Sequence, residues 1–245
     1  MHKLLAAIAA LQIATPSAAR AAESVVLAGT VVEVRTSEDE SVTKQLRRVL
    51  PAAVRAASRW GALPPSVILA IHATHGDFED ATGRFGRPWL RAWARKGSID
   101  LQSPLTWSRG YASDDALTQI LAHELIHCML FHTLSQSEHA RSIPTWFMEG
   151  LATFTAGEHH SQASALALLD PAPLLQSNPA LVYGTADRVF RDLVGRFGEP
   201  SVRQLLVRLG EGYAFAAAFE EATGVSQAQF EGDMARRLLG STPSG

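Results

Sequence analysis

Apolar and polar residues follow two different patterns along this chain of 245 residues. In the first half, residues 24–35 alternate and are rich in valine, residues 67–73 form an apolar run with β-branched side chains, and residues 98–103 alternate cleanly. Alternation places successive side chains on opposite faces of a strand, so we predict three strands, the last with one polar face. Helical spacing of apolar residues over 41–60, ended by Gly61, predicts a helix between the first two strands.

From about residue 113 onward the spacing is helical almost throughout. Ser113, followed by two aspartates, offers an N-cap and negative charge to a helix that runs to about residue 134. Pro144 suits the first position of a second helix, which we expect to cover residues 145–156. Strands followed by helices predict an α+β fold, with an N-terminal mixed sheet and helices before a mostly helical C-terminal half. Further helices are expected at residues 164–169, 183–197, 200–209, 213–222 and 227–239.

The first of these C-terminal helices contains the sequence His-Glu-Leu-Ile-His at residues 123–127. Residues four apart lie on one face of a helix, so His123 and His127 can present two imidazole nitrogens to one metal ion. Glu124 lies about 100° further round the helix, close enough to reach a metal-bound water. The flanking residues are apolar, and burial of these three side chains is costly unless they have partners. Two ligands and a general base on one helix are typical of zinc proteases.

A catalytic zinc ion usually takes three protein ligands, so a third must come from elsewhere in the chain. The longer motif that ends in a third histidine is absent, because its glycine and histidine positions hold Leu130 and Thr133. His132 lies off the ligand face, and His139 is expected in an exposed loop. Glu149 is the better candidate, because it is a carboxylate among aromatic and aliphatic residues on the next predicted helix, where burial without a cation is costly.

Four segments together resemble the bacterial peptidase MA-like family, which belongs to the gluzincins, the thermolysin-like zinc peptidases. They are His-Glu-Leu-Ile-His, then Pro-Thr-Trp-Phe-Met-Glu-Gly-Leu-Ala from residue 144, Tyr-Gly-Thr-Ala-Asp-Arg-Val-Phe-Arg-Asp-Leu-Val from residue 183, and Arg-Phe-Gly-Glu from residue 196. The resemblance spans roughly residues 98–239. It implies a zincin-like fold and a metallopeptidase that acts on a peptide or protein substrate.

The resemblance also implies roles for individual residues. His123, His127 and Glu149 would bind Zn²⁺, and Glu124 would act as the general base. The zinc would lower the pKa of its water toward ~7, and Glu124 would take the proton and pass it to the leaving amine. The strand at residues 98–103 would be the sheet edge along which a peptide lies. A non-catalytic zincin-fold binding or scaffold domain is the alternative, although such a domain has no use for a base beside its ligands.

The remaining parts of the site are predicted from their positions in the chain. An oxyanion partner is required, and Tyr183 is a candidate because it opens a helix after a loop that could border the cleft; a simply packed aromatic is the alternative. His159 and His160 could serve instead, although an adjacent pair after Gly-Glu is typical of an exposed turn. Thermolysin-type enzymes often carry an aspartate where this chain has Thr153. A threonine could accept an imidazole N–H without raising its basicity as a carboxylate does.

The N-terminal residues predict export. Residues 1–22 have a basic start, an apolar run and the sequence Ala-Arg-Ala at residues 19–21, which are the three parts of a secretory signal peptide. The apolar run is shorter than the ~20 residues of a spanning helix, and an uncleaved anchor is the alternative. We therefore expect a secreted or periplasmic protein without an integral membrane segment after cleavage, in which residues 23–245 form a single domain.

Charge and cysteine content argue against other classes of protein and site. The net charge is −2, and loss of Lys3 and Arg20 with a leader takes it to −4, which does not favour a nucleic-acid partner. Residues 84–96 mix arginines with tryptophans. We expect the tryptophans to pack inward and the arginines to be solvated. Cys128 is the only cysteine, so no internal disulfide can form, and it points away from the histidine face.

Overall fold

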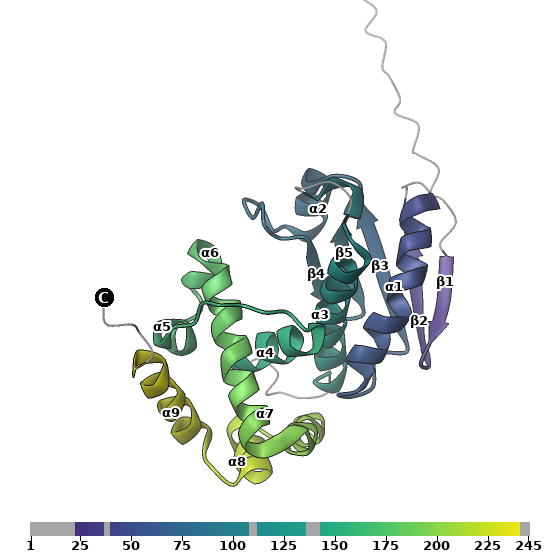
Figure 1. Ribbon diagram of the computed structural model, residues 1–245. Coiled ribbons are helices and arrows are strands. Elements are labelled where there is room, and N and C mark those ends of the chain that lie inside the picture. Colours follow the sequence, from purple (N-terminus) through teal and green to yellow (C-terminus); the bar gives the residue numbers. More distant parts are fainter. Residues whose placement is uncertain (1–22, 37–39, 108–111, 136–142, 241–245) are drawn as a thin grey trace, which may run out of the picture.

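The fold comes from a computed structural model that describes residues 23–36, 40–107, 112–135 and 143–240. Its strands are β1 (Glu23–Leu27), β2 (Thr30–Arg35), β3 (Ser66–His72), β4 (Ala92–Arg95) and β5 (Ser98–Gln102). Its helices are α1 (Glu40–Ser58), α2 (His75–Thr82), the 3-10 turn η1 (Pro104–Thr106), α3 (Asp114–Thr133), α4 (Thr145–Ala156), α5 (Ala165–Leu169), α6 (Leu174–Ser177), α7 (Pro179–Gly210), α8 (Phe215–Thr223) and α9 (Gln227–Gly240). This order confirms the predicted α+β fold, with a sheet-bearing first half and a mostly helical second half (Figure 1).

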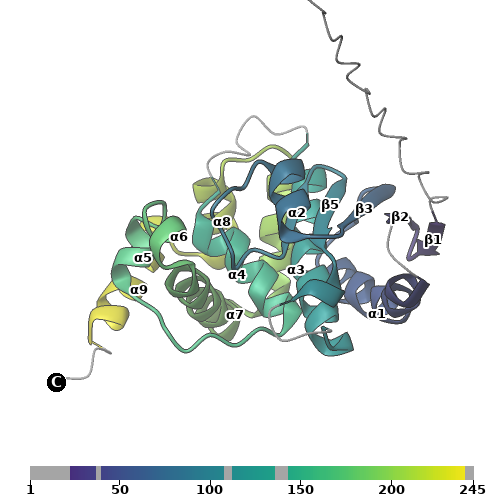
Figure 2. The same ribbon diagram turned by 90° about the horizontal axis from the view of Figure 1, so that it is seen from above.

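The five strands form one mixed sheet in the order β1-β2-β3-β5-β4. The central pairs β2–β3 and β3–β5 are parallel, and both outer pairs are antiparallel. The pairing places the buried apolar side chains of β2, β3, β5 and β4 on one face of the sheet. Seen from above, α1 and α3 lie along one side of the strands (Figure 2). Their apolar residues join the sheet in one core, to which the sheet contributes Val32, Val34, Val67, Leu69, Ile71, Ala92, Ala94, Ile99 and Leu101.

The single strand predicted at residues 24–35 is a hairpin. Ala28 (φ 48°) and Gly29 (φ 82°) both have positive φ, which is the geometry of a two-residue turn between twisted strands. Leu27 then pairs with Thr30 across the turn. The valine alternation continues through the turn, and for this reason the sequence pattern reads as one strand.

The prediction that residues 98–103 form the sheet edge is wrong. β5 lies between β3 and β4, and even its polar residues Asp100 and Gln102 are only 8% and 3% exposed. The sheet edge next to β5 is β4, which lies between residues 73 and 98, where no strand is predicted from the sequence. Asp100 contacts His72 (2.7 Å) and Arg95 (3.1 Å), which lie on the two neighbouring strands. Because its polar side chains have such partners within the sheet, β5 shows the same alternation as an edge strand although it is central.

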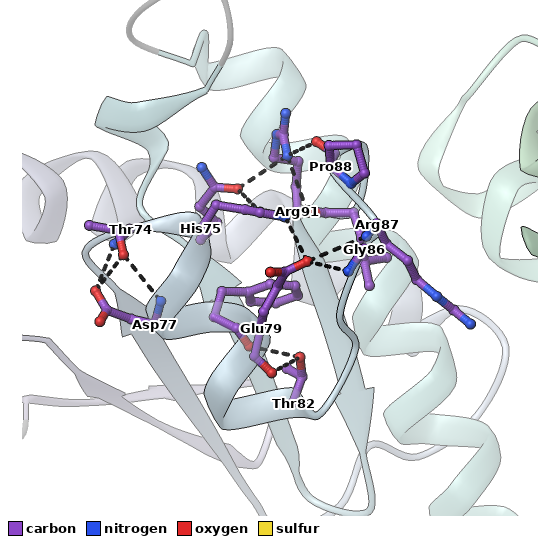
Figure 3. Close-up of polar contacts among 12 residues, drawn as sticks. Thr74, His75, Asp77, Glu79, Thr82, Gly86, Arg87, Pro88 and Arg91 are labelled. Carbon is purple, nitrogen blue, oxygen red and sulfur yellow. Dashed lines mark hydrogen bonds and ion pairs between the residues drawn. The ribbon is translucent and has the colours of Figure 1, made fainter.

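The same stretch also contains α2, which begins with a capping box. The Thr74 hydroxyl accepts a hydrogen bond from the Asp77 N–H, and the Asp77 carboxylate accepts one from the Thr74 N–H (Figure 3). Gly83, with φ 66°, ends the helix. Glu79 on α2 then accepts hydrogen bonds from the backbone N–H groups of Gly86 (2.7 Å) and Arg87 (3.4 Å). These bonds hold the loop that leads into β4.

The two helices that carry the candidate ligands are formed as predicted. Ser113 caps α3 by accepting a hydrogen bond from the Ala116 N–H, and α4 has the predicted bounds with Pro144 at its N-cap. α7 joins two of the predicted helices across a break at Gly198, which has φ 79°. α4 lies between α3 and α7, so it connects the two halves of the molecule (Figure 1).

α4 and α7 approach each other very closely beside the candidate site. A Cβ added at Gly150 would lie 2.5 Å from the carbonyl oxygen of Ala186 and 2.6 Å from Cβ of Phe190. Only glycine fits there, and it fixes the position of its neighbour Glu149.

None of the described helices is long and apolar enough to span a membrane. The predicted signal peptide lies outside the described residues, and the single domain at residues 23–245 stays a prediction.

Candidate metal centre

Two imidazole rings and a carboxylate meet where α3 packs against α4. His123 and His127 lie one turn apart on α3, with ring centroids 5.0 Å apart. Oε2 of Glu149, on α4, lies 3.3 Å from Nε2 of His123 and 3.5 Å from Nε2 of His127. One ligand atom from each residue lies within 4.8 Å of the others. The structure thus brings together the three residues that the sequence predicts as metal ligands.

The spacing of these atoms suits a tetrahedral metal ion. Ligand atoms at ~2.0–2.1 Å from a tetrahedral zinc are separated from one another by about 3.3 Å, close to the separations found here. Glu149 Oε2 is buried and has no hydrogen-bond partner among the described residues. Although burial works against the carboxylate, the charge of His127 and the contacts with both imidazoles hold the pKa of Glu149 well below its ordinary value. Two imidazole nitrogens and a charged oxygen therefore form a donor set that fits zinc.

Glu124 lies beside this group and is itself buried. Burial raises the pKa of the Glu124 carboxyl, His123 and His127 oppose the rise, and the charge of Glu149 adds to it. A backbone hydrogen bond from Ala94 on β4 favours the ionised form and anchors the side chain. A carboxylate with a raised pKa is a stronger base than one in water, as a proton acceptor at neutral pH requires.

Glu158 belongs to the site and was missed in the sequence. Gly157, with φ 69°, ends α4 and turns the chain back, so that Glu158 Oε1 lies 3.0 Å from Nδ1 of His123. Its other oxygen lies 3.1 Å from Nε2 of His160. Burial acts to raise the pKa of Glu158, but the hydrogen bonds with His123 and His160 outweigh it and lower the pKa to about 2. A histidine that binds metal through Nε2 commonly donates Nδ1–H to a carboxylate, and Glu158 occupies that place for His123.

Two predictions about neighbouring residues need correction. No hydrogen bond joins Thr153 to an imidazole among the described residues, and its buried hydroxyl donates to the carbonyl of Gly150 in its own helix (3.1 Å). His160 is half-buried rather than exposed, and its ring stacks on Tyr183 at 6.2 Å; His159 is exposed as expected. The glycine that closes the ligand helix marks the end of that helix in the sequence, but it does not indicate which residues the following segment contacts.

Tyr183 lies within α7 near its start, although the sequence predicted that it opens a helix. Its ring centroid is 6.0 Å from that of His123 and 6.2 Å from that of Trp89. Burial raises the pKa of the Tyr183 phenol well above its ordinary value, and the charges of Glu149 and Glu124 raise it further. The phenol therefore keeps its proton at neutral pH and can donate a hydrogen bond. Its role as oxyanion partner stays a prediction.

Two cavities flank the metal centre, and both are lined by Leu90, Ala92, His123, Glu124 and Tyr183. The first, of about 150 Å³, extends toward Trp89, Arg91, Ile120 and Glu158. The second, of about 170 Å³, extends toward Trp93, Ala94, His127, Phe131, Met148 and Glu149. The small alanine side chains of β4 leave this space open beside the histidines.

None of the remaining candidates belongs to the potential metal-binding group found among the described residues. The tryptophans of residues 84–96 are half-buried around the cavities instead of packed into the core, and Arg84 stacks on Trp93 at 3.9 Å. Cys128 is buried behind the site, where burial raises the pKa of its thiol to about 12. His132 belongs to none of the potential metal-binding groups found among the described residues, and His139 lies outside them.

No protein-family model matches the chain, and no curated protein matches it. A solved structure of an aminopeptidase N family protein from Idiomarina loihiensis is similar to it, with a TM-score of 0.40 and 12% sequence identity. The similarity covers 92% of this chain and 44% of that one, so this chain spans less than half the length of that protein.

Proposed function

We propose that this protein is an exported zinc metallopeptidase that hydrolyses peptide bonds, with His123, His127 and Glu149 as zinc ligands and Glu124 as the general base. The observation that carries the proposal is the convergence of Glu149 Oε2 with both Nε2 atoms, next to a buried glutamate that is not itself one of the three donors. The resemblance of the sequence to the gluzincins supports the same assignment of roles.

The number of donors favours catalysis over a structural role. Structural zinc sites are closed by four protein ligands, whereas catalytic sites have three and keep one position for water or substrate. The metal-binding group found among the described residues has three members and is bordered by two cavities. A site of this kind gives a substrate access to the metal.

The chemistry follows from the side chains around the centre. When bound, zinc supplies a Lewis acid and lowers the pKa of water. Glu124 accepts the proton of the attacking water and later donates it to the leaving amine. Tyr183, protonated and adjacent, donates a hydrogen bond to the carbonyl oxygen as negative charge develops on it. Glu158 keeps the proton of His123 on Nδ1, which leaves the Nε2 lone pair directed toward Glu149.

The edge strand β4 offers the substrate a backbone partner. The Gln102 N–H donates to the carbonyl of Arg91 (2.8 Å), so the alternation of an antiparallel pair directs the backbone groups of Ala92 and Ala94 away from β5. The Ala94 N–H is bonded to Glu124, which leaves the backbone groups of Ala92 and the carbonyl of Ala94 for a substrate. An extended peptide can pair with such an edge. The role that the resemblance implied for residues 98–103 therefore passes to β4.

Metal analysis combined with a peptidase assay tests the proposal. The mature protein, purified from its native host, should contain about one zinc ion per chain and cleave peptides in a mixed library. A chelator should abolish cleavage, and added zinc should restore it. A protein that binds zinc but cleaves no peptide would instead be the non-catalytic binding domain.

A further inference from the structure

A third and larger pocket, of about 810 Å³, opens at the Arg95 end of β4. It shares Trp93, Ala94, Phe131 and Met148 with the cavity over the metal centre, so the two adjoin. The larger pocket is also lined by Thr82, Arg84, Arg95, Lys96, Leu130, Leu134 and Ser135. A peptide that lies along β4 across the metal centre would continue into it.

The lining of this pocket combines apolar side chains with positive charge. Leu130, Phe131, Leu134 and Met148 supply the apolar part, and no carboxylate lines the pocket among the described residues. Three cations line it, and within the described part of the chain two of them, Arg84 and Lys96, have no carboxylate partner. The third, Arg95, pairs with Asp100 (3.1 Å).

Arg84 is held in position over the pocket. Its guanidinium stacks on the Trp93 ring at 3.9 Å, which limits its rotamers. Burial lowers the pKa of Arg84, and the positive charges of Arg87 and Arg95 lower it further, a sign of excess positive charge in this region. A carboxylate placed here would relieve that repulsion.

We propose that this pocket selects substrates with an aspartate or glutamate, next to an apolar residue, two to four positions to one side of the scissile bond. This inference rests on the proposed peptidase function. The spacing follows from the end of the strand: Ala94 borders the metal centre, β4 ends one residue on at Arg95, and Lys96 begins the turn to β5, so the cations lie within about 7 Å of Ala94 along the chain at ~3.3 Å per residue. Two residues of an extended substrate span the same distance.

The other side of the metal centre lacks these features. The cavity of about 150 Å³ there is lined by Trp89 and Ile120, and also by the Glu158 carboxylate, which would repel an acidic side chain. Its one cation, Arg91, donates to the carbonyl of Pro88 (2.6 Å) and to Gln102 (3.2 Å). The preference for an acidic residue is therefore confined to one side of the scissile bond.

Paired peptides test the preference. For each side of the scissile bond we compare two peptides that differ only in having Glu or Gln three residues from that bond. For each peptide, kcat/KM is measured at low salt. On one side the Glu peptide should be cleaved about fivefold faster, an advantage that salt reduces. The double variant Arg84→Gln, Lys96→Gln should lose this advantage, so that its kcat/KM values for the Glu and Gln peptides become equal. The control double variant Lys44→Gln, Arg236→Gln, which removes two exposed cations on α1 and α9, should keep it.

A binding measurement separates this inference from the proposed function. In the Glu124→Gln variant with zinc, peptide binding is followed through tryptophan fluorescence, without turnover. Equal binding and equal cleavage of Glu and Gln peptides would overturn the pocket assignment and leave the peptidase intact. If the Glu peptide bound more tightly than the Gln peptide but the wild type cleaved neither, the result would support the pocket's preference for an acidic residue and reject the peptidase function. Binding to vesicles of anionic lipid that depends on Arg84 and Lys96, without any peptide preference, would assign the pocket to a membrane surface and also overturn the inference.

Discussion

Glu124 and Glu158 both lie close to His123, and their surroundings shift their pKa values in opposite directions. Burial dominates for Glu124 and raises its pKa, whereas hydrogen bonds with two imidazoles lower that of Glu158 to about 2. Two carboxyl groups with divergent pKa values divide the work of a site, because the one with the raised pKa accepts a proton more readily and the other stays charged. The base and the orienting residue can be tested separately.

Replacement of the base should abolish turnover without loss of metal. Glu124→Gln keeps the shape of the side chain but cannot accept a proton, so kcat should fall by at least about 10²–10⁴-fold, the usual contribution of a general base. Zinc content, measured by atomic absorption, should match that of the wild type. Near-full activity of this variant on a wild-type substrate would show that another group is the base.

Loss of the third donor should have the converse effect. Glu149→Ala leaves two imidazoles facing a cavity, so zinc affinity should fall sharply and hydrolysis should disappear with it. Competition with a chelator of known affinity measures the change. His139→Ala and Glu138→Ala should bind zinc as the wild type does, and a loss of zinc in either of them would mean that the third ligand has been misassigned.

Glu158 should act on zinc only through His123. Glu158→Gln should weaken zinc binding by about 10–100-fold, the usual effect of removing a carboxylate behind a ligand histidine. His159→Gln changes an exposed side chain one residue along and serves as the control. Equal zinc affinities of the two variants would leave Glu158 without a positioning role.

The segment that carries Glu158 packs closely against α7. A Cβ at Gly184 would lie 1.9 Å from the carbonyl oxygen of Gln162, so Gly184→Ala must displace the segment that carries Glu158 and His160. We expect lower activity and a loss of about 1–3 kcal/mol of stability. Gly195→Ala, on the same helix, meets nothing within 4 Å and should be neutral or stabilising by up to ~1 kcal/mol. Thermal unfolding and activity of the pair check this, and similar behaviour of both variants would argue against tight packing at Gly184.

The elements that could be predicted from the sequence are those whose signals are local. α3 and α4 follow from apolar spacing together with Ser113 and Pro144 at their starts. β4 could not be predicted, because it has four residues, Ala-Trp-Ala-Arg, and none of them is β-branched. The sheet edge was assigned to β5 instead of β4 for a different reason, because the order of strands depends on pairing between segments that are distant in the sequence.

The same distinction applies to the site. His123, Glu124 and His127 share one helix, so their spacing alone predicts their convergence. Glu149 required a second signal, a carboxylate in an apolar helix. Glu158 contacts a residue 35 positions away through a turn at Gly157, and no local pattern indicates such a contact.

For the whole molecule, the ionised Glu158 should stabilise the metal-free fold in a defined pH range. Its folded-state pKa of about 2 lies below the ordinary 4.5, so its contribution is complete above pH 4.5 and is lost as pH falls toward 2. At neutral pH the metal-free wild type should exceed Glu158→Gln by up to about 3 kcal/mol in free energy of unfolding. Denaturant unfolding at several pH values should show this difference shrinking below pH 4.5. A difference that stayed constant down to pH 2 would mean that the charge of Glu158 does not stabilise the fold.

The brevity of β4 has a consequence for how the molecule coexists with its own copies. An open sheet edge can recruit any extended chain, including another copy of the same protein, and long flat edges promote aggregation. β4 has four residues, roughly 13 Å at ~3.3 Å per residue, and is too short to hold a partner by backbone pairing alone. An extended chain therefore stays bound to β4 only when pockets for its side chains add to the binding. A short edge beside pockets lets a cleaved product leave quickly and gives a neighbouring molecule little backbone to pair with.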